Sequence, residues 1–191
     1  MKNYLHTYLG NLSSSGGGLD FASVTCRYGK FTIYCIIGPE ENIVHLSFTP
    51  EKHERAQKRL ESLNSKVSIR KILQKKFHFD NTFADYFSCR LTTFPISNES
   101  PFIAAGTDFQ KRIWRRIGEI PYGCSITYQQ LAESAGSPKG SRAAGMACGA
   151  NPVALIIPCH RVVAVNGLGG FAGGVAVKEA LLALEQTGAK L

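Results

Sequence analysis

Two capping-box sequences fix where two helices of the second half of the chain begin. Thr107-Asp108-Phe109-Gln110 and Thr127-Tyr128-Gln129-Gln130 each place a threonine at the N-cap and a glutamine three residues later. After the first box, apolar residues recur at helical intervals until Pro121 stops the run; they are Phe109, Ile113, Ile117 and Ile120. The pattern predicts a helix over 108–119, with Trp114 in the core.

The second capping box opens a helix that is followed by a turn and another helix. Apolar residues continue one face of this helix (Leu131, Ala132 and Ala135), and Gly136 is suited to end it. Residues 137–140, Ser-Pro-Lys-Gly, form a turn, and a further helix is predicted over about 141–150. This is the outline of a helix-turn-helix, although any pair of antiparallel helices gives a similar outline.

The helix predicted over 141–150 is made almost entirely of small residues, with Arg142 and Met146 as the exceptions. Its backbone can therefore come very close to another surface. The composition alone leaves two readings open, which are tight packing against another helix and direct contact with DNA.

The first half reads as a small α+β unit. Strands are predicted at 31–37 and 43–48, joined as a hairpin, followed by a charged helix from 51 to about 63. Shorter helices are predicted at 69–77 and 83–87. Residues 11–18 have the composition of a flexible stretch, and residues 94–106 that of a connector. We therefore expect an N-terminal domain at 1–100 and a C-terminal domain at 101–191.

The composition excludes several classes of protein. No apolar run is long enough for a membrane span, and the first residues lack the apolar core of a signal peptide, so a soluble intracellular protein is expected. The formal charge of +8 is compatible with nucleic-acid binding but is shared evenly between the halves. The six cysteines have no paired short spacing, which argues against disulfides and zinc ribbons.

A candidate nucleophile follows an apolar run near the C-terminus. Val153-Ala154-Leu155-Ile156-Ile157, predicted as a buried strand, leads directly into Pro158-Cys159-His160-Arg161-Val162-Val163. A thiol beside an imidazole and a guanidinium can be held as a reactive thiolate. Taken alone, this arrangement leaves protease, hydrolase and redox roles open. The other cysteines are predicted to be inert; they are Cys26, Cys35, Cys89, Cys124 and Cys148.

Taken together, the motifs of the second half resemble those of the DNA repair alkyltransferases, the methylated-DNA–protein-cysteine methyltransferases or O6-alkylguanine-DNA alkyltransferases. The resemblance runs in order from Thr107 to Glu185 and rests on 106–110, 120–123, 127–128, 142–145, 151–152 and 158–163. The first half matches only in layout. The implied fold is α+β, with a small ribonuclease-H-like α/β domain followed by a mostly helical domain that carries a winged-helix-like helix-turn-helix.

The resemblance also implies catalytic roles. Cys159 would accept an alkyl group from the O6 oxygen of guanine irreversibly and in a single turnover, and O4-alkylthymine stays open as a second substrate. His160 would act as base through a water, and Glu185 would orient the imidazole. Tyr128 would supply a proton to the guanine, and Asn151 would hold the loop of Cys159. No cofactor and no metal are implied; the candidate ligands Cys26, Cys35, Cys89, His6, His45, His53 and His78 support no site by their spacing.

The partner implied by the resemblance is double-stranded DNA that contains alkylated guanine, bound by a monomer away from membranes, in the cytoplasm or, in a eukaryote, the nucleus. A buried thiol cannot reach a stacked base, so the nucleotide has to be flipped out through the minor groove. Arg142 would fill the gap that the base leaves. The other DNA-binding residues implied are Tyr128, Ala143, Ala144, Gly145 and Arg161.

The chain departs from the family in the loop expected to cover the flipped base, formed by Phe171, Ala172 and Gly173. The family usually has Tyr and often Ser at the first two positions and one more residue before the paired glycines. The loss of two hydroxyl groups leaves the choice of alkyl group open. Two other functions also remain, a damage sensor that flips the base without transfer and a Cys-His hydrolase with turnover.

Overall fold

The fold was obtained as a computed structural model, which describes residues 19–38, 42–62, 67–72, 79–94 and 100–188. The stretch predicted to be flexible, 11–18, lies outside these ranges. So do the tip of the predicted hairpin, at 39–41, and residues 95–99 of the predicted connector.

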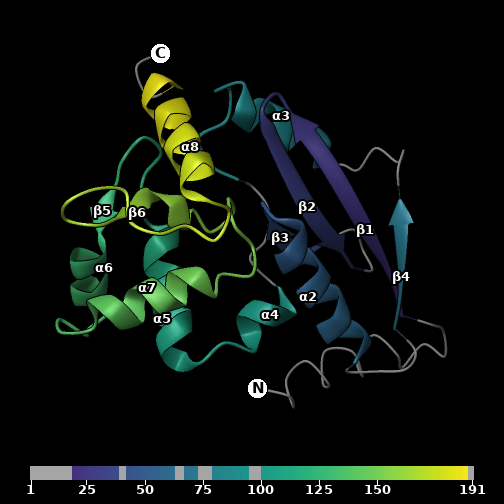
Figure 1. Ribbon diagram of the computed structural model, residues 1–191, viewed down its shortest axis with the longest axis horizontal. Helices are drawn as coiled ribbons and strands as arrows, with labels where there is room; N and C mark the ends of the chain where they lie inside the picture. The colour runs from purple at the N-terminus through teal and green to yellow at the C-terminus, as the bar shows by residue number, and fades with distance from the viewer. Residues whose placement is uncertain (1–18, 39–41, 63–66, 73–78, 95–99, 189–191) are drawn as a thin grey trace.

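The first half contains a four-stranded sheet of strands β1 (Leu19–Tyr28), β2 (Phe31–Ile37), β3 (Ile43–Ser47) and β4 (Val67–Ile72), shown in purple to teal in Figure 1. The strand order is β3-β2-β1-β4. β1 and β3 both run antiparallel to β2, whereas β4 is parallel to β1. Because two parallel strands need a crossover, the helix α2 (Pro50–Glu61) connects β3 to β4.

Helices cover both faces of this sheet. Leu60 and Ala56 of α2 pack with Phe21, Ile36 and Val44 against one face. Residues Ile33, Cys35 and Ile37 point to the other face, where they join the larger core with α3 (Asp80–Phe87) and the helical second half. Burial on both faces explains why the strands lack a simple alternation of apolar and polar residues.

Most elements predicted for the first half are confirmed, namely the two strands of the hairpin, α2 and α3. The helix predicted over 69–77 is wrong where the structure describes it, because residues 67–72 form the edge strand β4. Val67 and Ile69 pack inward, while Ser68 and Arg70 bond Asp20 of β1 on the exposed side. Pairing with β1 therefore overrides a local pattern that resembled a helix.

The second half is helical, in the order α4 (Pro101–Ala104), α5 (Asp108–Gly118), α6 (Tyr128–Ser134), α7 (Ser141–Gly149) and α8 (Val175–Gly188). Both predicted capping boxes form, with the side chains of Thr107 and Thr127 accepting from the backbone of Gln110 and Gln130. Gly136 ends α6 with a φ of +75°. The helix-turn-helix of α6 and α7 is thus confirmed, flanked by the short parallel pair β5 (Ile126–Thr127) and β6 (Val162–Val163).

The apolar run 153–157 is buried, as predicted, but is not a strand. It makes only isolated bridges, between Val153 and Leu46 and between Ala154 and Ile157. Leu155 takes a φ of +74°, which breaks the extended backbone. Cys159 consequently begins a short 3-10 turn, Cys159–Arg161, rather than the end of a strand.

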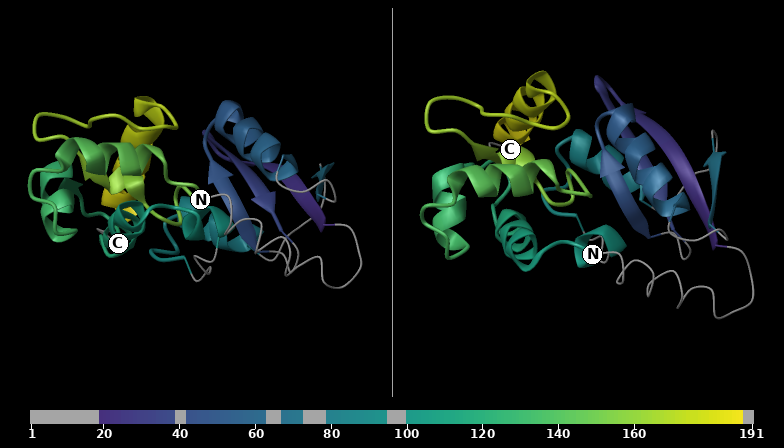
Figure 2. Two further views of the ribbon diagram at one scale, coloured as in Figure 1. Left: turned by 90° about the horizontal axis from the view of Figure 1, so that it is seen from below. Right: turned by 60° about the horizontal axis from the view of Figure 1, so that its bottom comes forward.

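The sheet part and the helical part lie side by side and share one core (Figure 2). Backbone hydrogen bonds join them, from Leu46 N to Pro152 O at 3.0 Å and from Ala154 N to Leu46 O at 3.0 Å. The predicted α+β class, with a small sheet domain preceding a helical part, is confirmed. None of the helices in the described ranges is both long and apolar enough to cross a membrane.

Candidate active site and DNA-binding face

A pocket of about 510 Å³ opens between α7, the start of α6 and the loop that precedes α8. Six of the predicted site residues line it, namely Tyr128, Arg142, Gly145, Cys159, Phe171 and Ala172. They come from four separate segments of the chain. The fold therefore brings the predicted nucleophile, proton donor, arginine and lid to one cavity.

The Cys159 thiol lies at the inner end of this pocket and is 6% exposed. The side-chain amide of Asn151 donates to its sulfur at 3.1 Å and to Ile157 O at 2.7 Å, and Asn151 Oδ1 accepts from Val153 N at 3.1 Å. One side chain thus bonds both ends of the loop that carries the thiol.

The protonation of Cys159 is balanced between burial and nearby donors. Burial raises the pKa of the Cys159 thiol above its ordinary value, while the Asn151 amide, the charges of Lys52 and Lys178 and its own backbone amide act to lower it. The net pKa stays raised. Cys159 is therefore mostly a thiol at neutral pH and needs a base to take its proton.

His160 and Glu185 form a buried pair next to this thiol. Both are 0% exposed, and His160 Nε2 lies 2.7 Å from Glu185 Oε1. Burial lowers the pKa of His160, and Arg161 and Lys178 act in the same direction against Glu185. A neutral imidazole that donates from Nε2 to a carboxylate carries its lone pair on Nδ1. His160 Nδ1 is buried and has no hydrogen-bond partner within the described ranges, which leaves it free to act as a base.

Glu185 is the centre of a dense hydrogen-bond network. Besides His160, its carboxylate accepts from Arg161 Nε and Nη2, both at 2.9 Å, and from Gly123 N at 3.1 Å. Burial alone would raise the pKa of Glu185, but hydrogen bonds from His160 and Arg161 outweigh it and lower the pKa to about 2. Glu185 is thus a fixed anion at neutral pH.

The position of Arg161 corrects its predicted role as a DNA contact. Its side chain is 7% exposed and is occupied by Glu185 and by Ile120 O, to which Nη1 donates at 2.6 Å. A buried guanidinium that is paired in this way cannot also bind a phosphate at the surface. Arg161 instead holds Glu185 in place.

Tyr86 of α3 joins this network from the sheet part and was not predicted from the sequence. Its hydroxyl donates to Glu185 Oε1 at 2.5 Å and lies 3.5 Å from His160 Nε2. The phenol is fully buried, and burial followed by the charge of Glu185 raises its pKa well above the ordinary value. In the sequence, Tyr86 is one aromatic residue beside Phe83 and Phe87, and many core tyrosines occur in such a pattern.

Tyr128 lines the pocket from the first turn of α6. Its hydroxyl donates to Gly170 O at 3.0 Å, and burial, with smaller contributions from Cys148 and Cys159, raises its pKa to about 12. The ammonium of Lys178, a second residue that the sequence reasoning missed, lies 5.5 Å from the centre of the Tyr128 ring. Lys178 also donates to Val162 O at 2.5 Å, so it ties α8 to the residues that follow Cys159.

The exposed face of α7 carries Arg142 and Met146, one turn apart, and Met146 is 66% exposed. Ala143 and Gly145 are half-buried beside them. Ala144 is 0% exposed and lies in the core with Ala147 and Cys148, which corrects its predicted role in DNA contact. Both readings of the small-residue composition therefore apply, each to a different face of the same helix.

The predicted lid is anchored on the sheet part through Phe171. Its ring packs against Phe48 with centroids 5.8 Å apart. A Cβ at Gly173 would come within 2.7 Å of the Phe171 ring and of the Phe48 Cβ, so only glycine permits this contact. Ala172 is exposed at the mouth of the pocket.

No group of three or more His, Cys, Asp or Glu side chains could hold a metal ion within the part of the chain that the structure describes. Two of the histidines considered as ligands, His6 and His78, lie outside that part.

Comparisons with known proteins agree with this geometry. A family model described as "6-O-methylguanine DNA methyltransferase, DNA binding domain" matches residues 108–187. A methylated-DNA–protein-cysteine methyltransferase of Methanosarcina barkeri is 39% identical, over 79% of this chain and 89% of the relative. One of Methanosarcina mazei is 37% identical, over 84% of this chain and 96% of the relative.

Solved structures show the same likeness. The O6-methylguanine methyltransferase of Mycobacterium tuberculosis superposes with a TM-score of 0.72 at 29% identity, over 87% of this chain and 93% of that chain. The structure of the same enzyme in complex with DNA gives a TM-score of 0.69 at 30% identity, over 87% and 94% of the two chains.

Proposed function

Because this chain belongs to the methylated-DNA–protein-cysteine methyltransferases, we propose that Cys159 takes the alkyl group from O6 of an alkylated guanine in double-stranded DNA and keeps it. The observation that carries this proposal is the placement of Cys159, beside a base with a free Nδ1, in the pocket lined by Tyr128 and Arg142. Each protein molecule would act once, because the alkyl group stays on Cys159 in a stable thioether.

The proton of the thiol passes first to His160. A water between Cys159 Sγ and His160 Nδ1 would relay it, and Glu185, held as an anion, stabilises the imidazolium that results. The thiolate then attacks the alkyl carbon, so that a carbon–sulfur bond forms as the carbon–O6 bond breaks. The electron pair of the broken bond moves into the guanine ring.

Tyr128 supplies the proton that this ring needs, because an anionic guanine is a poor leaving group. With its pKa raised to about 12, its hydroxyl remains protonated at neutral pH. In the structure this hydroxyl donates to Gly170 O of the lid. Proton transfer therefore requires that the base replace Gly170 as the acceptor, which couples the chemical step to a shift of the lid.

Access to the thiol requires base flipping, since Cys159 is almost fully buried. The face of α7 formed by Arg142, Met146 and the half-buried Gly145 would lie in the minor groove, with the Arg142 side chain in the space left by the base. Gly145 keeps the helix surface low beside the pocket. A Cβ at this position would lie 3.8 Å from the Tyr128 ring, which is an ordinary van der Waals contact.

The test is to incubate the protein with a duplex that contains one O6-methylguanine and to measure the intact mass. One methyl adduct per chain is expected, located on Cys159 by peptide mapping. Cys148→Ala is the matched control, because Cys148 is a second buried thiol on the wall of the same pocket. It should accept one methyl group, and Cys159→Ala should accept none.

The outcome also separates the alternative functions. A wild-type protein that binds the duplex but gains no mass would be a damage sensor, and the proposal would fall. Repeated release of product by one protein molecule would instead indicate a hydrolase. We further propose that a single chain acts inside the cell without a cofactor or a metal. The expected result is full transfer in the presence of a chelator by protein that sediments as a monomer.

A further inference from the structure

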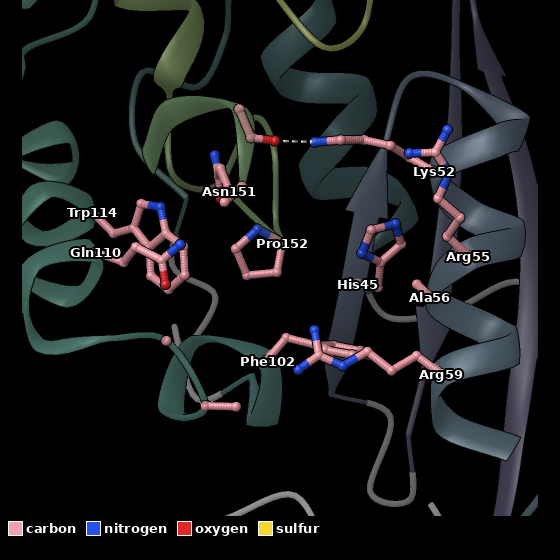
Figure 3. A pocket seen from close by; sticks show the side chains of 14 residues that line it. His45, Lys52, Arg55, Ala56, Arg59, Phe102, Gln110, Trp114, Asn151 and Pro152 are labelled. Atoms are coloured by element: carbon pink, nitrogen blue, oxygen red, sulfur yellow. Dashed lines mark hydrogen bonds between the residues drawn. The ribbon is translucent and has the colours of Figure 1, made fainter. Parts of the chain in front are cut away.

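A second pocket, of about 240 Å³, lies between α2 of the sheet part and the helical part. Figure 3 shows Lys52, Arg55 and Arg59 of α2 on one side, with Gln110 and Trp114 of α5 on the other. Pro152 and the imidazole of His45 lie between them. None of the functions assigned above uses this pocket.

The pocket is strongly cationic, and no acidic residue of the described part of the chain lines it. Lys52, Arg55 and Arg59 recur at helical spacing, so they share one face of α2. Lys52 donates to Gly149 O at 2.7 Å, and Arg59 lies over the Phe102 ring at 5.4 Å. In the described ranges the ion pairs all involve other cations, so neither Arg55 nor Arg59 has a carboxylate partner. Cations gathered without counter-charge favour an anionic occupant.

The buried side chain of His45 gives a second, independent indication. It lines the pocket at 5% exposure, and its Nε2 is buried with no hydrogen-bond partner among the residues that the structure describes. Burial, His53 and Lys52 lower the pKa of His45 to about 3, against an opposing contribution from the backbone of Pro152. A buried polar atom is normally paired, so an unpaired one beside cations is a candidate contact for a bound anion.

The pocket adjoins the proposed DNA-binding face. Gly149, the last residue of α7, lines both this pocket and the one that holds Cys159. A DNA strand that follows α7 beyond its C-terminal end would therefore pass the cations of α2. The volume is below that of most small-molecule sites, which suits a single phosphate group.

We propose that this pocket is an oxyanion site that binds one phosphate group through Arg55 and Arg59. Guanidinium groups hold phosphate by charge-assisted, often bidentate hydrogen bonds. The phosphate is either one of the DNA backbone, in which case the inference rests on the proposed function, or a free phosphate ion, in which case it does not. The site extends ligand binding from the helix-turn-helix to the sheet part.

The free ion is tested with inorganic phosphate at constant ionic strength. The chain has one tryptophan, Trp114, and it lines the pocket, so its fluorescence should report binding, with calorimetry as a second measurement. Saturable binding to the wild type is expected, weakened about tenfold or more in the double variant Arg55→Gln, Arg59→Gln. Arg70→Gln, an exposed arginine of β4, is the matched control and should bind like the wild type.

The DNA backbone is tested by the salt dependence of binding to an undamaged duplex. If a backbone phosphate occupies the site, the slope of log K against log salt should fall by about 0.9 in the double variant and stay unchanged in Arg70→Gln. Since Arg59 also contacts Phe102, the single variant Arg55→Gln and a thermal unfolding curve guard against a folding defect. For Arg55→Gln alone, a smaller fall of the salt slope is expected.

The two results separate the sources. Phosphate saturation with an unchanged salt slope identifies a free ion, and a reduced slope identifies the backbone. The inference is overturned if phosphate does not bind and the slopes of all variants agree. The same protein preparations are also incubated with the O6-methylguanine duplex, and absence of the methyl adduct in the wild type refutes the proposed function separately.

Discussion

At the scale of single residues, the site depends on how Glu185 is held. Four donors from three parts of the chain converge on this carboxylate, from Tyr86 of α3, Gly123 before β5 and the adjacent pair His160 and Arg161. The first of these comes from the sheet part. Tyr86 is therefore a positioning residue, because it shares the negative charge that stabilises the His160 imidazolium.

Replacing Tyr86 by phenylalanine should change the pH dependence of alkyl transfer. With one donor fewer, more of the charge of Glu185 acts on His160, which raises the His160 pKa. Because only neutral His160 can take the thiol proton, the acidic limb of the rate profile should move to higher pH. The free energy of unfolding should also fall by about 1.5–3 kcal/mol, as for other hydrogen bonds to charged groups. Single-turnover rates between pH 5 and pH 8 provide the measurement.

Tyr28→Phe is the control for this change. Tyr28 also packs on α3, through Phe83 and Phe87, but its hydroxyl donates to Asp80 O at 3.5 Å and not to Glu185. Its pH profile should match that of the wild type. An unshifted profile in Tyr86→Phe, with reduced stability alone, would show that Tyr86 only packs the core.

The sequence predicted the residues of the site that belong to continuous motifs and missed those that approach it from elsewhere. Cys159, His160 and Asn151 lie within nine residues of one another, so a local motif specifies them. Tyr86 and Lys178 reach the site only through tertiary packing. Arg161 and Ala144 were assigned to the DNA face because a motif gives residue identity without the direction of a side chain.

At the scale of elements, the second capping box links helix stability to the site, because Thr127 precedes Tyr128. Thr127→Ala removes the acceptor for Gln130 N at 3.1 Å and should cost about 1 kcal/mol of stability. It should also slow alkyl transfer by loosening the turn that places the Tyr128 phenol. Urea denaturation and single-turnover rates measure the two effects.

Thr107→Ala provides a matched control, since Thr107 caps α5 through the same pair of hydrogen bonds away from the pocket. A similar loss of stability is expected without slower transfer. Equal rates for the two variants would contradict the proposed link between the α6 cap and Tyr128.

The elements themselves were predictable where local signals are strong. The capped helices and the hairpin carry their own start and stop residues. β1 received no prediction, although Ser23, Thr25 and Arg27 alternate with apolar residues in the pattern of a half-buried strand, so this local signal was missed. β4 and the run 153–157 depend on partners distant in sequence, the first on β1 and the second on Leu46. Local pattern cannot encode such pairings.

At the scale of the whole molecule, buried neutral histidines should make stability depend on pH. The pKa of His45 is about 3 in the folded state and 6.5 as the ordinary value, so the unfolded chain binds the proton more readily. As pH falls below 6.5, this residue should therefore lower the free energy of unfolding by about 1.4 kcal/mol per pH unit. Denaturation curves of the wild type and His45→Gln should diverge in slope between pH 6.5 and pH 4. Parallel curves would contradict the buried neutral state.

Alkylation of Cys159 should itself loosen the molecule. The added methyl group competes for the space in which the Asn151 amide donates to Sγ at 3.1 Å, so this buried donor should lose its partner at a cost of about 1–3 kcal/mol. The next residue, Pro152, accepts from Leu46 N of β3, so strain at Asn151 reaches the junction of the two parts.

The measurement is the unfolding midpoint of the methylated protein, purified after reaction, against the unreacted protein. A decrease of about 2–4 °C per kcal/mol is expected for a chain of this size. Hydrogen exchange should increase at Leu46 and Ala154, whose amides form the junction. Cys159→Ala carried through the same incubation controls for the procedure. Identical midpoints would mean that the pocket absorbs the methyl group and that Asn151 finds another acceptor within it.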